Sequence, residues 1–133
     1  MTAVKLVIVF DDELGEGPRY DPGSVLSGRA VLTPGARTTV NGVSLSVHWK
    51  TRGRGVGDSG EAWSRKEAIP EGGRVVEAVQ TMSWPFRCQL PESPWSYTGK
   101  YVSIVWEVSV TLDVPWARDP KAARTFILRP PPA

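Results

Sequence analysis

Few side chains in this sequence could act as an acid, a base or a nucleophile, and their spacing does not group them. His48 is the single histidine, and it lies within an alternating segment at residues 43–50. A Ser-His-Asp arrangement is conceivable because serine and aspartate are plentiful. An isolated histidine on the wet face of a strand is the simpler interpretation. We therefore predict that the protein has no catalytic residues.

Cys88 is the single cysteine, so an intrachain disulfide is impossible and a reducing compartment is favoured. A structural zinc site needs several nitrogen or sulfur ligands, which one histidine and one cysteine do not supply. We predict no metal and no cofactor. Cys88 shares an expected strand face with Phe86 and Leu90, which favours a buried cysteine that packs as a small hydrophobic residue.

Two further segments have a composition that could bind ions. The glycine-rich stretch 53–60 lacks the Gly-Lys-Ser/Thr and the following helix of a phosphate loop. It is better explained as a flexible hairpin tip, at which Arg52 and Arg54 could contact an acidic partner. The acidic residues at 11–16 lack the spacing of an EF-hand, so we expect a solvated turn.

The elements that would carry these residues are strands. In residues 102–113 apolar and polar residues alternate, which predicts that Ile104, Trp106 and Val108 are buried and that Ser103, Glu107 and Ser109 are not buried. Further strands are expected near 4–10, 26–32, 43–50, 62–69, 74–82, 84–90 and 122–129. Turn sequences such as Asp-Pro-Gly and Asn-Gly separate them. Seven to nine short strands with such turns predict an all-β antiparallel β-sandwich.

The charge and the N-terminus exclude other classes. The formal net charge is +2, and basic and acidic residues are interleaved, so the basic stripe of a nucleic-acid-binding protein is missing. The apolar run at residues 1–10 is short and contains Lys5, which argues against a signal peptide or a membrane span. We expect a soluble cytoplasmic protein that does not bind nucleic acid and does not insert into a membrane.

Two blocks of sequence resemble the N-terminal domain of arrestins. The first is Tyr20-Asp21-Pro22-Gly23 followed by a strand with Gly28 in its middle. The second runs from Trp84-Pro85-Phe86 to Leu90-Pro91, through Ser96-Tyr97-Thr98-Gly99, into the alternating strand and on to Leu112-Asp113-Val114-Pro115. That family includes arrestins, retromer subunits of similar fold and bacterial sporulation-control proteins.

The resemblance implies one immunoglobulin-like, arrestin-like sandwich over residues 1–129. The proline-rich residues 130–133 cannot join the interior of a sheet, so we expect a flexible tail there. Arrestins have two such domains, and this chain has room for one. Arrestins also sense receptor phosphates with adjacent lysines on the first strand, whereas Lys5 is followed here by Leu6. Recognition of phosphorylated receptors is therefore not carried over.

By the same resemblance we expect a non-enzymatic adaptor or scaffold that binds a protein partner or a second copy of itself. A structural subunit of a larger oligomer is one alternative, and a carbohydrate-binding module is another. Val7 and Val9 make the first strand apolar on both faces apart from Lys5, so either another chain or an internal segment should cover it. Trp63, Trp95 and Trp116, in or beside loops, either pack over the ends of the sandwich or anchor a partner. The candidate partner-binding residues are Lys5, Val7, Val9, Arg52, Arg54, Trp63, Trp95 and Trp116.

Overall fold

The computed structural model of the chain describes residues 4–11, 18–55, 57–69, 73–115 and 119–130. These residues form eleven strands and no helix. The strands are β1 (Val4–Phe10), β2 (Arg19–Tyr20), β3 (Val25–Pro34), β4 (Thr38–Val40), β5 (Gly42–Gly53), β6 (Ser59–Ala68), β7 (Arg74–Val76), β8 (Met82–Gln89), β9 (Tyr97–Thr98), β10 (Val102–Asp113) and β11 (Lys121–Leu128). In the described part of the chain, therefore, no helix is available to cross a membrane.

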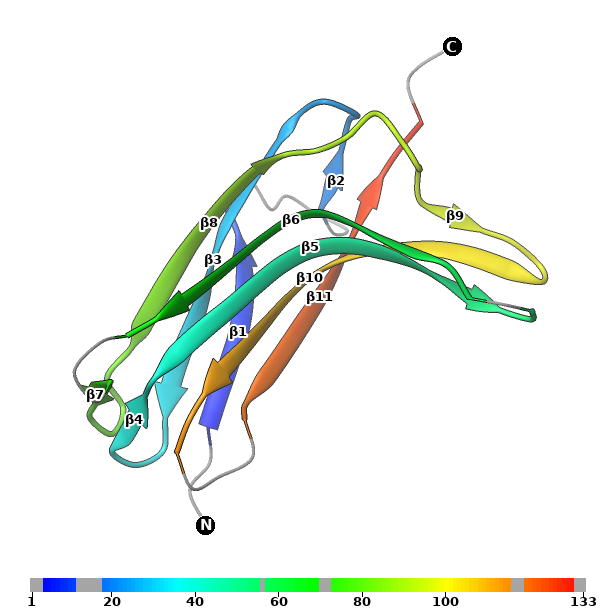
Figure 1. Cartoon of the computed structure of the whole chain (residues 1–133). Coiled ribbons are helices and arrows are strands. Elements are labelled where there is room, and N and C mark those ends of the chain that lie inside the picture. Colours follow the sequence, from blue (N-terminus) through cyan, green and yellow to red (C-terminus); the bar gives the residue numbers. More distant parts are fainter. Residues whose placement is uncertain (1–3, 12–17, 56, 70–72, 116–118, 131–133) are drawn as a thin grey trace.

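Two principal sheets make up the molecule (Figure 1). The smaller sheet has the order β1-β3-β8, and the larger has the order β2-β11-β10-β5-β6, with β9 added on β10. β4 and β7 form a separate two-stranded ladder. All pairings are antiparallel except the short parallel one between β11 and β2. The predicted all-β sandwich is confirmed.

Side chains from the facing surfaces of the two sheets form one core. In β3 and β8 every second residue is buried, as the alternation predicted for Leu26 to Leu32 and Trp84 to Leu90. An aromatic cluster joins the sheets, with ring centroids 5.7–6.3 Å apart among Phe10, Tyr20, Phe86, Trp106 and Phe126. Large aromatic rings supply much of the apolar area that stabilises such a core.

The prediction for β10 was wrong at two positions. Trp106 and Val108 are buried as expected, but Glu107 is buried too, at 8% exposure, because His48 and Lys50 of β5 lie against its carboxylate. Ile104 is half-buried, because this end of β10 extends beyond the core residues that cover Trp106. Trp49 of β5, the cross-strand partner of Trp106, is likewise half-buried and packs against the margin of the core.

The strand expected at 74–82 is also shorter than predicted. β7 ends at Val76, a turn follows, and β8 begins at Met82. Val79 within that turn has a positive φ of 59°, a conformation that is rare for a β-branched residue and incompatible with a continuous strand.

Two arginines of the larger sheet connect its strands to the edge strands of the smaller sheet. Arg124 of β11 donates a hydrogen bond to the carbonyl of Ile8 in β1 at 3.1 Å, and Arg65 of β6 donates one to the carbonyl of Pro85 in β8 at 2.8 Å. Strand edges otherwise offer unpaired backbone groups to other chains, so these contacts protect both sides of the sandwich.

The long strands of the larger sheet reach beyond the smaller sheet. β5 and β10 pair over all 12 residues of each strand, from Gly42↔Asp113 to Gly53↔Val102. Figure 1 shows that β5, β6 and β10 bend and project together from the sandwich, with β9 beside them. We call this projection the arm, residues 50–60 and 95–105 apart from the undescribed Val56, with Trp95 at its base. Its surface facing the same way as Trp106 is the inner face, and the opposite surface of the sheet is the outer face.

Candidate functional site

Exposed apolar side chains gather on the arm. Trp95 at its base is 43% exposed, Tyr97 56%, Tyr101 60% and Val102 40%. They stand within eight consecutive positions, whereas the other exposed large apolar side chains of the described residues are scattered. Exposed apolar patches on a soluble protein mark interaction sites, because leaving them in water is unfavourable.

A pocket of about 410 Å³ opens at the base of the arm, and we call it the arm pocket. Its lining consists of Ser93, Pro94, Trp95, Ser96, Tyr97, Ile104 and Pro130. Tyr97 and Ile104 are cross-strand partners, so both side chains lie on the inner face. The lining is largely aromatic and aliphatic, which suits an apolar group.

Hydrogen bonds hold the arm pocket in shape. The indole of Trp106 donates to the carbonyl of Pro94 at 2.7 Å, and the indole of Trp95 donates to the carbonyl of Glu92 at 2.8 Å. Ser96 both donates to and accepts from the backbone of Leu128, at 2.7 and 2.9 Å. The segment that carries Trp95 is therefore tied to the core and to β11, and a ligand would meet a formed site.

The tip of the arm is cationic and aromatic. Arg54 lies 5.8 Å and Lys100 lies 5.4 Å from the ring centroid of Tyr101, both within cation–π range. The amide of Arg54 donates to the carbonyl of Tyr101 at 3.0 Å. Gly53, at φ 132°, permits this approach, because a Cβ there would overlap the same carbonyl. The glycine-rich stretch is thus a hairpin tip, as predicted.

A polar network occupies the outer face of the larger sheet. Glu107 accepts hydrogen bonds from His48 Nε2 at 2.8 Å and from Lys50 Nζ at 3.1 Å. His48 Nδ1 lies 3.1 Å from the hydroxyl of Ser46, which lies 2.8 Å from that of Ser109. Burial raises the pKa of Glu107, but the hydrogen bonds and charges of His48 and Lys50 outweigh it and hold the pKa below its ordinary value.

This network contains a serine, a histidine and an acid, which the sequence alone could not place together. A catalytic triad also needs donors for the oxyanion. Backbone N–H groups of neighbouring strands lie in the plane of the sheet and pair with each other, so they do not point at a group above Ser46. The arrangement fits a structural polar network better than an acyl-transfer site.

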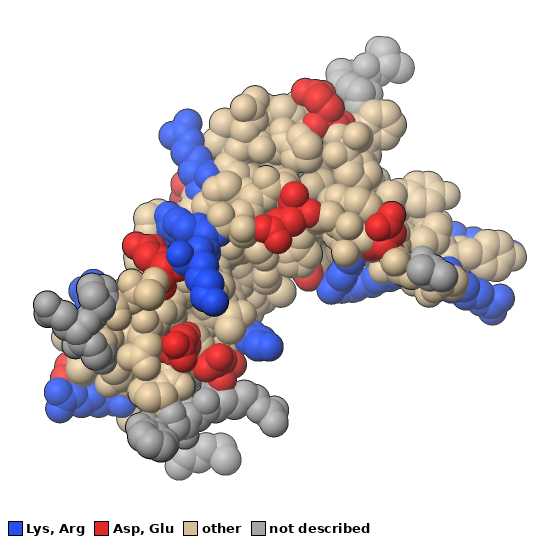
Figure 2. Space-filling view, in the orientation of Figure 1, with Lys and Arg blue, Asp and Glu red and all other residues tan. Residues whose placement is uncertain are grey.

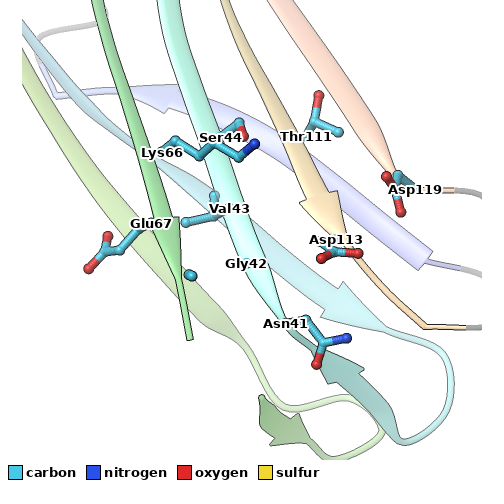
Figure 3. Close-up of a pocket in the computed structure, with 10 residues that line it drawn as sticks. Asn41, Gly42, Val43, Ser44, Lys66, Glu67, Thr111, Asp113 and Asp119 are labelled. Carbon is cyan, nitrogen blue, oxygen red and sulfur yellow. The ribbon is translucent and has the colours of Figure 1, made fainter. Parts of the chain in front are cut away.

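A second pocket, of about 370 Å³, lies on the larger sheet far from the arm (Figure 3). Asn41, Gly42, Val43, Ser44, Lys66, Glu67, Ala68, Thr111, Asp113 and Asp119 line it. Both signs of charge are present, and no group of metal-ligating side chains occurs among the described residues. Figure 2 likewise shows basic and acidic side chains scattered over the visible face, with a hollow beneath the arm.

The structure separates the candidate partner-binding residues. Arg54 and Trp95 lie on the arm, while Arg52 is exposed on its outer face, opposite Ser103. Trp63 is half-buried against the core, with Arg65 5.8 Å from its ring centroid. Trp116 lies outside the described residues.

Lys5, Val7 and Val9 lie on the first strand, which is an edge of the smaller sheet. Lys5 and Val7 are exposed, and Val9 is half-buried. Asp11 N–H bonds to Ser27, so by the alternation of an antiparallel ladder the amides of Val7 and Val9 face β3.

Cys88 is buried, as expected, and burial raises the pKa of its thiol to about 11. Sequence reasoning missed Tyr97, Lys100, Tyr101 and Ile104 of the arm. The signal was the segment Tyr97-Thr98-Gly99-Lys100-Tyr101, where two aromatic residues flank a turn instead of alternating within a strand.

Comparison with known proteins places this fold in a family. The arrestin (or S-antigen) N-terminal domain model matches residues 62–131, just over half of the chain. The chain belongs to the arrestin N-terminal-domain family. No curated protein matches the sequence.

A solved structure extends the arrestin-like fold to nearly the whole chain. Spo0M, a sporulation control protein from Bacillus subtilis, matches with a TM-score of 0.70 over 95% of this arrestin-like chain, at 14% identity. At that identity the likeness concerns the fold alone. The match covers 49% of Spo0M, so this chain spans about half the length of that protein.

Proposed function

We propose that this arrestin-like domain is a non-enzymatic adaptor that binds a partner protein through the inner face of its arm. The observation that carries the proposal is the gathering of Trp95, Tyr97, Tyr101 and Val102, which are exposed beside a formed apolar pocket. Aromatic residues around a pocket are typical of the side chains that dominate binding energy. Family membership supports an adaptor role, and the single buried thiol supports a cytoplasmic setting.

The arm pocket favours a protein ligand over a sugar. Sugar sites combine an aromatic platform with several convergent hydrogen-bonding groups. Here the indole N–H of Trp95 is already committed to Glu92, and prolines and Ile104 supply most of the remaining wall.

Site-specific photo-crosslinking tests the proposal. A benzoylphenylalanine replaces Tyr97 on the arm or, as a control, the exposed Thr125 on the outer face of β11. Irradiation of cells that make the full chain should join one partner protein to position 97 and not to position 125, and mass spectrometry identifies it. Equal yields at the two positions, or no protein product at 97, would contradict the proposal.

Self-association through β1 is a second candidate. Leu6 and Phe10 direct their backbone groups to the open side of this edge strand, on either side of the Ile8 carbonyl that Arg124 binds, and Val7 is 37% exposed on its face. Replacing Val7 and Val9 with threonine keeps β propensity and removes apolar surface. A folded double variant that changes from dimer to monomer by sedimentation would support this candidate, whereas a wild-type monomer would exclude it.

A further inference from the structure

We infer that the arm binds an extended acidic segment of its partner, with one large apolar side chain in the arm pocket and carboxylates at the tip. This inference rests on the proposed function and specifies the chemistry of the partner. It follows from three features of the arm: the pocket, the line of side chains that leads away from it, and the charge at the end of that line.

The pocket fixes the position of the apolar anchor. Trp95 and Tyr97 present exposed rings, and half-buried Ile104 lies on β10 between Tyr97 of β9 and Thr51 of β5. A volume of about 410 Å³ accommodates an aromatic or long aliphatic side chain. The hydrogen bond from Trp106 to Pro94 keeps this site in place before a ligand arrives.

The inner face continues from the pocket to the tip. Val102 stands two positions from Ile104 on β10, so the two side chains share a face about 7 Å apart. Tyr101 lies at the tip, one position before β10 begins and outside the ladder that defines the inner face, with Arg54 and Lys100 beside its ring. An extended segment advances about 3.3 Å per residue, so a carboxylate two to four residues from the anchor reaches these cations.

The charge at the tip favours acidic ligands. Among the described residues neither Arg54 nor Lys100 takes part in an ion pair. Residues 51–60 and 99–103 contain Arg52, Arg54 and Lys100 against Asp58, a net charge of +2 (three basic minus one acidic). Anionic membranes usually attract clusters of about four to eight basic residues, more than this tip offers, so a protein segment fits better.

A random-peptide display selection on the full chain tests the inference. Wild-type protein should enrich peptides with a tryptophan, phenylalanine or leucine followed within about four residues by aspartate or glutamate. The Arg54→Glu/Lys100→Glu variant should bind the selected peptides about fivefold more weakly, as two exposed ion pairs imply, and should itself select lysine and arginine. Arg29→Glu/Arg87→Glu, which reverses two exposed charges on the outward face of the smaller sheet, is the matched control and should leave the selection unchanged.

The outcomes separate the two levels of the account. The inference would be overturned if the peptides bound through Trp95 and Tyr97 with no preference for acidic residues. It would also be overturned if the Arg54→Glu/Lys100→Glu variant still preferred acidic peptides. Either result would leave the adaptor function standing. If no selected peptide binds at the arm pocket, and no partner crosslinks to position 97, both the inference and the proposed adaptor function are wrong. Loss of binding to vesicles containing 30% phosphatidylserine (about one lipid in three) in the tip variant, with peptide binding intact, would identify a membrane as the ligand and overturn the inference.

Discussion

Replacing Glu107 with glutamine should lower the stability of the protein at neutral pH. The carboxylate receives hydrogen bonds at 2.8 Å from His48 and 3.1 Å from Lys50, and its side chain is 10% exposed. A hydrogen bond to a charged group contributes about 1.5–3 kcal/mol. The glutamine keeps an oxygen that can accept, and Lys50 is 39% exposed and partly screened by water, so we expect a net loss of about 1–2 kcal/mol.

The effect should depend on pH with a definite sign. The pKa of Glu107 is lower in the folded protein than its ordinary value of 4.5, so its ionised form stabilises the fold above that value. This stabilisation disappears as the pH falls through the folded-state pKa. The difference between wild type and variant should therefore be full at pH 7 and shrink progressively below about pH 4.5.

Urea unfolding followed by tryptophan fluorescence gives the free energy of unfolding of wild type and variant at pH 7 and at about pH 3. Glu61→Gln is the matched control, because Glu61 is exposed opposite His48 on β6 and should change stability by less than about 0.5 kcal/mol. A difference for Glu107→Gln that is equal at both pH values would refute the role of the charge. No difference at either pH would refute the network altogether.

Three further predictions follow from the core. Trp106→Ala should cost about 3–5 kcal/mol in urea unfolding, whereas Thr125→Ala on the exposed face of β11 should cost under about 0.5 kcal/mol; equal losses would mean that the assigned inward and outward faces of β10 and β11 are wrong. Gly28→Ala should cost at least about 1–3 kcal/mol, because a Cβ there overlaps the Val9 carbonyl and the Phe86 ring, and a neutral result would contradict the close packing of β3 against β1. Cys88 should react with a disulfide reagent at pH 8 only after unfolding in urea, because its thiol is buried with a pKa of about 11; rapid reaction of the native protein would contradict that burial.

Alternation and turn residues were sufficient to predict the sandwich from the sequence. Each inward residue of β3 and β8 follows from period two, because side chains of a strand point to alternate faces. The resemblance to arrestins was also confirmed, and the matched residues 62–131 include the segment around Trp84.

The errors arose where burial depends on neighbours in space. Alternation assigned Glu107 to the outer face correctly, but its burial comes from His48 and Lys50, which the register between β5 and β10 brings alongside. Ile104 lies on the inner face as expected, but β10 extends there beyond the smaller sheet, so no residue of that sheet covers it. The sequence of one strand does not say how far the strands of the facing sheet extend.

On the arm too, the sequence alone could not predict which residues of the candidate site come together. Trp95 and Arg54 were candidates on residue type alone, and the structure places both on the arm. Tyr97 joins them through its pairing with Ile104, and Lys100 through a turn that meets the β5–β6 hairpin. Contacts between segments that are far apart in the sequence cannot be predicted from the alternation of residues or from composition.

The most direct test of the account is the affinity of the crosslinked partner, once purified, for the Trp95→Ala/Tyr97→Ala variant by calorimetry. Two central aromatic contacts of at least about 1 kcal/mol each predict a loss of at least about 30-fold. The melting temperature should stay within a few degrees of wild type, because both rings are exposed. An affinity within twofold of wild type, in a variant that remains folded, would contradict the claim that the arm binds the partner.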